Sequence, residues 1–256
     1  MIEQFFRPDS LGQAIELKAQ YGIEAVYMGG GSKLNATPTR TTRRIAISLD
    51  NLGLTAIERR QGQLHIGAMV TLQTLKDHPD TPAALKEALG FVYSRNLRNQ
   101  STLGGEVAAS GHEGVLLPVL LVLEADVLLE NDQREPLEQY LAGPREALVL
   151  GLALPDTRLR CATRRIARNA DGLTVIVAAV ALDPLGAQRI ALSCVTPVAR
   201  LHEVEQLNLE AAPLEASVAQ AITPVADLCG SVEYKRYIAG VVVADLLVDC
   251  QQQEEK

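Results

Sequence analysis

The sequence predicts an α+β fold, and three observations lead to this prediction. A helical pattern over residues 9–22 is followed directly by a short strand, residues 64–130 show short strands separated by helices, and a run of strands beyond residue 155 is followed by helices. The chain has 256 residues, of which 47% are hydrophobic, so it can bury a sizeable core. This length also suits two modest domains.

The amino-terminal part predicts a helix followed by two neighbouring strands. Asp9 and Ser10 are residue types that cap a helix, and Gly22 sits where a left-handed stop is easiest. Between them the apolar residues recur with the helical period, at Leu11, Ala14, Ile15 and Ala19. Strands are predicted at residues 25–28 and 44–49, and we expect the second to lie beside the first.

The middle of the chain predicts further strands and a domain boundary. Strands are predicted at Leu64–Met69 and Ala125–Glu130, with a helix that starts at Thr81 and Pro82 between them. Pro155 and Asp156 then interrupt the chain. We therefore expect one domain at 1–155, made of subdomains at about 1–55 and 56–155, and a second domain at 156–256.

The carboxy-terminal part predicts three strands followed by helices. The strands are expected at residues 161–167, 173–182 and 189–195. The second is ambiguous between a buried strand and a helix, and its Val and Ile content favours a strand. A final helix is predicted from Ser231, and it should pack on the sheet. The face expected to do so carries Tyr234, Tyr237, Ile238, Val241, Val242 and Leu246.

Charge, hydropathy and cysteine spacing exclude several classes of protein. The net charge of −7 and the pI near 5.2 leave no basic surface for nucleic acid. The longest apolar runs reach about half of the roughly 20 residues that cross a membrane, so we expect a cytoplasmic protein with no membrane partner. Cysteines 161, 194, 229 and 250 lie far apart, so we expect isolated thiols and no metal site.

Two glycine-rich segments are the best candidates for a binding site. Gly29–Asn35 follows a predicted strand, and the second segment is Ser101–Ala108. Each can expose consecutive backbone N–H groups and one hydroxyl, which together bind phosphate oxygens without a cationic side chain. If the segments face each other, they would hold a pyrophosphate. A bulky residue at Gly30 or Gly104 should then abolish cofactor binding and leave the protein folded.

The sequence offers no conventional catalytic group. The histidines are isolated, although His112 directly follows the second glycine segment and is the best candidate among them. Glu106 and Glu113 have no evident partner acid, so a two-carboxylate mechanism has little support. An electron carrier needs no general base of its own, because its cofactor carries out the redox chemistry.

The order of these motifs resembles a known family. The sequence Gly-Gly-Gly-Ser-Lys-Leu at 29–34, the stretch from Arg95 to Gly105 and the stretch from Asp227 to Tyr237 are similar to the FAD-binding subunits of molybdenum hydroxylases of the xanthine dehydrogenase and carbon-monoxide dehydrogenase type. The resemblance covers nearly the whole chain. It looks closest to a bacterial branch described as the FAD-binding subunit of a selenate reductase or purine hydroxylase.

This resemblance implies a fold, a cofactor and partners. The fold would be a two-part FAD-binding domain of the vanillyl-alcohol-oxidase (PCMH) type, followed by a small α+β domain like the carboxy-terminal domain of the carbon-monoxide dehydrogenase flavoprotein. Electrons would come from an iron–sulfur subunit and a molybdopterin-binding subunit, and would pass through FAD to NAD or another acceptor. The implied cofactor-binding residues are Tyr27, Met28, Gly29, Gly30, Gly31, Ser32, Lys33, Leu34, Thr102, Leu103, Gly104, Gly105, Glu106 and, on the flavin side, Arg165.

Two departures from the family pattern leave alternatives open. Glu106 stands where the family usually has Asn, and Val115 stands where an Asp is common. A carboxylate would repel phosphate if it pointed inward, although it would also accept a hydrogen bond from a ribose hydroxyl. One alternative is therefore a non-catalytic assembly subunit that binds FAD weakly or not at all. Another is a stand-alone flavin reductase or oxidase of the same fold.

Overall fold

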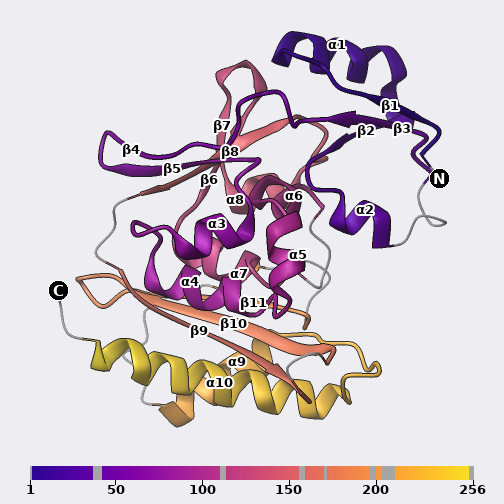
Figure 1. Cartoon of the computed structure of the whole chain (residues 1–256). Coiled ribbons are helices and arrows are strands. Elements are labelled where there is room, and N and C mark those ends of the chain that lie inside the picture. The colour runs from indigo at the N-terminus through magenta and orange to yellow at the C-terminus, as the bar shows by residue number, and fades with distance from the viewer. Residues whose placement is uncertain are drawn as a thin grey trace.

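The computed structural model describes residues 2–36, 42–109, 114–155, 159–169, 172–195, 200–202 and 211–253. Its described strands form three sheets, of three, five and four strands. Figure 1 shows the three-stranded sheet at one end, the five-stranded sheet next to it, a layer of helices, and then the four-stranded sheet. This mixture of helices and sheets confirms the predicted α+β class. Within the described part of the chain, no helix is long and apolar enough to span a membrane.

The amino-terminal sheet has parallel strands in the order β1-β3-β2. Its elements are β1 (Gln4–Phe6), α1 (Leu11–Tyr21), η1 (Gly22–Glu24), β2 (Ala25–Met28), α2 (Ser32–Ala36) and β3 (Ile45–Ser48). The predicted helix is confirmed, because the Ser10 hydroxyl accepts a hydrogen bond from the N–H of Gln13 at 3.3 Å and Gly22 has a φ of 54°. The neighbouring strands are also confirmed. β1 escaped prediction because three residues are too few to show a pattern.

The five-stranded sheet is antiparallel, in the order β4-β5-β8-β6-β7. Its strands are β4 (Ile57–Arg60), β5 (Gln63–Gly67), β6 (Asp126–Leu129), β7 (Arg134–Pro136) and β8 (Val149–Pro155). The helices of this part are α3 (Leu72–Asp77), α4 (Ala83–Gly90), α5 (Arg95–Gln100), α6 (Leu103–Ala108), α7 (Leu117–Val122), η2 (Glu130–Asp132) and α8 (Leu137–Ala142). The strands predicted near 64 and 125 and the helix after Pro82 are thus confirmed. All six residues of α7 are buried, so this helix forms the centre of the main core.

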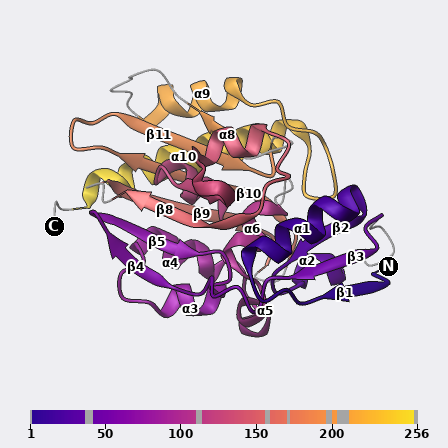
Figure 2. The same ribbon diagram turned by 90° about the horizontal axis from the view of Figure 1, so that it is seen from above.

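The carboxy-terminal sheet is antiparallel, in the order β12-β11-β10-β9. Its elements are β9 (Arg160–Ala167), β10 (Thr174–Leu182), β11 (Gln188–Ser193), β12 (Arg200–His202), α9 (Ala211–Ala221) and α10 (Val232–Gln252). Figures 1 and 2 show α9 and α10 on the outer face of this sheet. The three predicted strands and the final helix are confirmed, and the Ser231 hydroxyl caps α10 by accepting from the N–H of Tyr234 at 3.2 Å.

The face of α10 that packs on the sheet differs in part from the prediction. Tyr234 and Tyr237 are 43% and 61% exposed, whereas Ala239, Val243 and Leu247 are buried. The prediction is confirmed for Val242 and Leu246, which are buried, and for Ile238, which packs against the same core. It was wrong for the two tyrosines because it ranked side chains by apolar character. The small Ala239 and Gly240 allow the helix to approach its neighbours more closely. The added Cβ at Gly240 would lie 2.5 Å from a backbone carbonyl of α9.

Strand β10 is covered on both faces, which explains its uniformly apolar sequence. Ile176 and Val180 belong to the core beneath α9 and α10, while Ala179 and Ala181 belong to the core around α7. β8 of the central sheet ends at Pro155 and the next described residue is 159. A domain boundary between residues 155 and 156 stays a proposal. The parts on either side of it share an apolar interface, because Ala179 and Ala181 belong to the core around α7.

We predict that the core beneath α10 controls the stability of the carboxy-terminal part. Ile176→Ala should lower the free energy of unfolding by about 2–4 kcal/mol, because Ile176 is fully buried and truncation leaves a cavity. The matched change Leu185→Ala should have an effect below about 0.5 kcal/mol, because Leu185 is 95% exposed. Urea denaturation measures both, and equal effects would contradict this account of the core.

Candidate functional site

The two glycine segments predicted from sequence meet in space. The first, Gly29–Leu34, continues from β2 into α2, and the second, Ser101–Glu106, leads into α6. The hydroxyls of Ser32 and Ser101 lie 2.9 Å apart in a hydrogen bond. The Nζ atom of Lys33 lies 3.0 Å from Oε2 of Glu106. The segments therefore contact each other through side chains that are 69 or more positions apart in the chain.

Backbone hydrogen bonds hold the second segment against the chain that follows β5. The N–H of Leu103 donates to the carbonyl of Val70, and that of Gly104 donates to the carbonyl of Ala68, both at 2.9 Å. The Thr102 hydroxyl accepts from the N–H of Gly105 at 3.2 Å and so caps α6. These backbone hydrogen bonds fix the position of the second segment without any contribution from a ligand.

Gly30 and Gly104 allow close contact within the protein. A Cβ added to Gly30 would lie 1.5 Å from the carbonyl oxygen of Gln100, and one added to Gly104 would lie 2.6 Å from the Cβ of Ala68. The sequence-based reason for these two glycines, that a side chain would clash with a bound phosphate, is therefore wrong. The clash is with the protein's own atoms. At Gly30 it would push the two segments apart, and at Gly104 it would push the second segment away from Ala68.

A cavity of about 290 Å³ lies where the segments meet. Most of the residues predicted to bind a cofactor line it: Tyr27, Met28, Gly29, Gly30, Gly31, Ser32, Lys33, Leu34, Thr102, Gly105 and Glu106. The sequence-based prediction missed two further lining residues, Val26 and Ala109. Both are small apolar residues with no local signal of a site.

A larger cavity of about 680 Å³ adjoins the first and shares lining residues with it, including Tyr27, Gly29 and Thr102. Gly104 lines this larger cavity. Its charged residues are Lys18, Arg43, Glu130, Arg145 and Glu146. They were missed from sequence because they come from four separate segments, and only tertiary structure brings them together.

Burial and charge set the protonation of the groups in these cavities. Burial and, to a smaller extent, the nearby negative charge of Glu130 raise the pKa of Tyr27 well above its usual range. A tyrosine hydroxyl is already protonated at neutral pH and can donate a hydrogen bond, and this shift extends that range to more alkaline pH. The Oε2 atom of Glu130 is buried and has no hydrogen-bond partner among the described residues. Such an orphaned acceptor is rare unless a ligand or water satisfies it.

Two of the predicted residues lie elsewhere. The Leu103 side chain is fully buried in the main core. Arg165 lies on β9, where its Nε donates to the Thr174 hydroxyl at 2.8 Å, and it lines neither cavity. His112 and Glu113 fall outside the described residues, and the half-buried Val115 packs against the main core.

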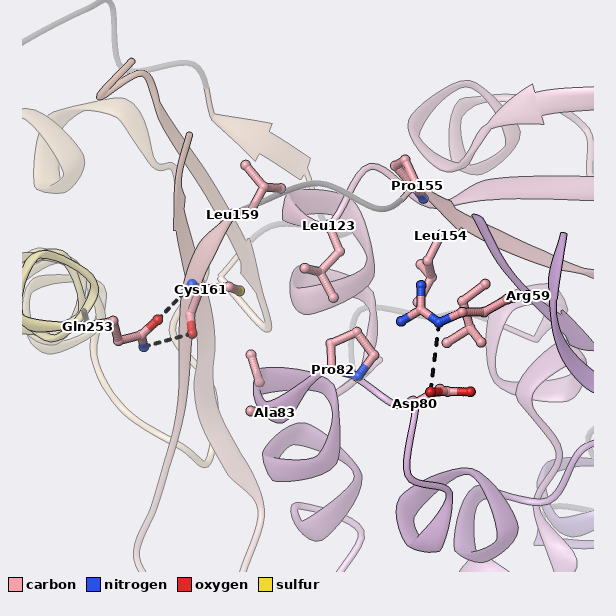
Figure 3. Close-up of a pocket in the computed structure, with 12 residues that line it drawn as sticks. Arg59, Asp80, Pro82, Ala83, Leu123, Leu154, Pro155, Leu159, Cys161 and Gln253 are labelled. Atoms are coloured by element: carbon pink, nitrogen blue, oxygen red, sulfur yellow. Dashed lines mark hydrogen bonds and ion pairs between the residues drawn. The ribbon is translucent and has the colours of Figure 1, made fainter. Parts of the chain in front are cut away.

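A third cavity, of about 160 Å³, lies where the central and carboxy-terminal parts meet (Figure 3). The Gln253 side chain bonds to both backbone groups of Cys161, accepting from its N–H at 3.2 Å and donating to its carbonyl at 3.1 Å. Burial raises the pKa of the Cys161 thiol well above its usual range, so the thiol is protonated and unreactive. Across the cavity Arg59 and Asp80 pair at 3.7 Å. Neither glycine segment reaches this cavity, and within the described residues no cluster of His, Cys, Asp and Glu could hold a metal ion.

We predict that Gly30→Ala will destabilise the protein by about 1–3 kcal/mol, the range typical of overpacking, because the new methyl group overlaps the Gln100 carbonyl. Gly12→Ala is the matched control, because Gly12 lies in α1 with nothing within 4 Å of an added Cβ. It should stabilise the protein by about 0.5–1 kcal/mol. Thermal and urea unfolding measure both, and a neutral Gly30→Ala would show that the segments can separate freely.

The chain is similar to known proteins over its whole length. Residues 1–157 match the family described as the FAD binding domain in molybdopterin dehydrogenase. A protein of Escherichia coli K12 named Uncharacterized protein YgfM is 56% identical over 257 residues, covering 100% of this chain and 99% of its own. The carbon monoxide dehydrogenase medium chain of Hydrogenophaga pseudoflava is 28% identical over an alignment that covers 94% of this chain and 94% of that protein.

Solved structures share the fold. Carbon monoxide dehydrogenase of Hydrogenophaga pseudoflava, in a form that lacks the Mo-pyranopterin moiety of its cofactor, contains a chain that matches with a TM-score of 0.89 at 22% identity, over 98% of each chain. A chain of the reconstituted enzyme of Oligotropha carboxidovorans matches with a TM-score of 0.87 at 21% identity, over 99% of each chain. The protein belongs to the family of FAD-binding subunits of molybdopterin dehydrogenases, and it is the flavoprotein component of an oxidoreductase.

Proposed function

We propose that this chain binds FAD across its two glycine segments and relays electrons through it within a molybdenum hydroxylase complex. The meeting of Gly29–Leu34 and Thr102–Glu106 at one cavity is the observation that carries the proposal. A second cavity extends from the first, so an elongated dinucleotide would occupy both. Their volumes lie within or close to the range of about 300–1,000 Å³ found for small-molecule sites.

The residues at the site fit a dinucleotide. The first hydrogen bond of α2 runs from the N–H of Asn35 to the carbonyl of Gly31 at 2.9 Å, so the N–H groups of residues 32–34 have no partner inside the helix. They lie beside Gly31, whose φ of 70° directs the backbone into the turn. These groups would donate to the diphosphate, while the orphaned Glu130 oxygen would accept from a hydroxyl or amine of the nucleoside.

FAD, when bound, supplies the capacity to accept and release electrons, and the protein supplies position and electrostatics. The chain's own residues bind and orient it. Tyr27, whose hydroxyl is protonated at neutral pH, would donate one hydrogen bond at the junction of the two cavities. No general base is required, which agrees with the absence of a conventional catalytic set in the sequence.

The name of one relative supports a proposal about the partners. One relative is named as the medium chain of a carbon monoxide dehydrogenase, and medium implies further chains in that enzyme. We therefore propose that this chain assembles with an iron–sulfur subunit and a molybdopterin-binding subunit. NAD, or another acceptor, would then take the electrons from FAD.

A pair of cavity-filling variants tests where FAD binds. Ala109 is exposed and lines both cavities at the glycine segments, whereas Ala83 is exposed and lines the third cavity. Ala109→Phe should weaken FAD binding at least about tenfold, a loss of about 1.4 kcal/mol, because the ring occupies the ligand's space. Ala83→Phe should leave the affinity unchanged. Equilibrium dialysis with FAD measures both.

Two outcomes of this experiment would count against the proposal. Weakening by Ala83→Phe alone would move the site to the third cavity. A parent protein that takes up no FAD, although folded, would favour the alternative of an assembly subunit with lost cofactor binding.

A further inference from the structure

The ion pair between Lys33 and Glu106 is the one feature of the smaller cavity that does not follow from glycine-rich loops binding phosphate. Among the described residues that line this cavity, these two carry the charges. The Glu106 side chain is 10% exposed, and that of Lys33 is 39% exposed. The carboxylate is therefore the more buried partner, and Lys33 reaches it from the other glycine segment.

A carboxylate in this position needs a neighbouring cation for two reasons. Burial of an unpaired charge is unfavourable, and removing one partner of such a pair is costly. A lone carboxylate would also repel the diphosphate of a dinucleotide, since like charges a few ångströms apart interact strongly away from bulk water. Lys33 at 3.0 Å removes both penalties. The pair joins the segments and leaves the lining with no net charge.

We propose that Lys33 is a positioning residue that acts by cancelling the charge of Glu106, so that the cleft offers a neutral wall to the diphosphate. The ligand is then held by backbone N–H groups of the first glycine segment, and Lys33 does not itself need to contact the phosphate. This inference rests on the proposed FAD site and adds a role for its two charged residues.

A double-mutant cycle tests the proposal. The variants are Lys33→Met, Glu106→Gln and the double variant, with Lys86→Met as a matched control on α4, outside all three cavities. The readout is the dissociation constant of FAD, measured by quenching of flavin fluorescence at salt concentrations from about 0.05 M to about 0.5 M. Thermal unfolding of each variant reports whether it is folded.

The expected results differ for each variant. Lys33→Met should weaken FAD binding at least about tenfold, because Glu106 is left uncompensated. The double variant should return to within about threefold of the parent, because the wall is neutral again. Glu106→Gln should bind FAD at least as tightly as the parent and lose affinity more steeply with salt, because the cleft then carries an unpaired cation. Lys86→Met should behave as the parent.

Several outcomes would overturn the proposal. A double variant as weak as Lys33→Met would mean that Lys33 contacts the ligand directly. A Lys33→Met protein that binds like the parent would mean that the pair has no role in binding. If Lys33→Met does not fold, the FAD affinity of the double variant and the salt dependence of FAD binding by Glu106→Gln test the proposal without it. If the parent binds no FAD, the proposed function fails first, which is a result distinct from any difference among variants.

Discussion

The approach of Gly30 to the carbonyl of Gln100 is the contact on which the site depends. It leaves no room for even a methyl group, so the loop after β2 and the helix α5 meet backbone to backbone. This contact joins the small parallel sheet to the helical layer of the central part. It also places Ser32 opposite Ser101 and Lys33 opposite Glu106. The cavity walls are thus a consequence of a steric requirement that glycine alone satisfies.

Much of the fold was predictable because its signals are local. The cap at Ser10, the stop at Gly22 and the short strand after it all depend on neighbours within a few residues. The burial of α10 was not predictable in the same way. Its buried face includes Ala239, which is a weak apolar signal, while the more prominent Tyr237 faces outward. Which face is buried depends on how closely α9 and the sheet approach, and this is a tertiary property.

The site was also predictable only in part. The glycine segments could be found from composition, and their meeting could be proposed, but the reason for the glycines could not. From the sequence alone, the glycines suggest a backbone that a phosphate can approach closely. In the structure, Gly104 instead makes room for Ala68 of the same chain. Glu106 likewise appeared as an obstacle to FAD, because its partner Lys33 lies on a segment distant in sequence. Pairing between distant segments is invisible to any local pattern.

The two adjoining cavities differ in the chemistry they offer, and this difference suits a ligand with a charged centre and a polar end. The smaller cavity is neutral overall and presents backbone donors, which suit a diphosphate. The larger one contains the buried acceptor Glu130 and the donor Tyr27. Burial, and to a smaller extent the charge of Glu130, raise the pKa of Tyr27 further above neutral pH, where a tyrosine hydroxyl is already a donor. The side chains of the site therefore supply little net charge to the ligand, because Lys33 pairs with Glu106 and the remaining contacts come from neutral donors and one buried acceptor.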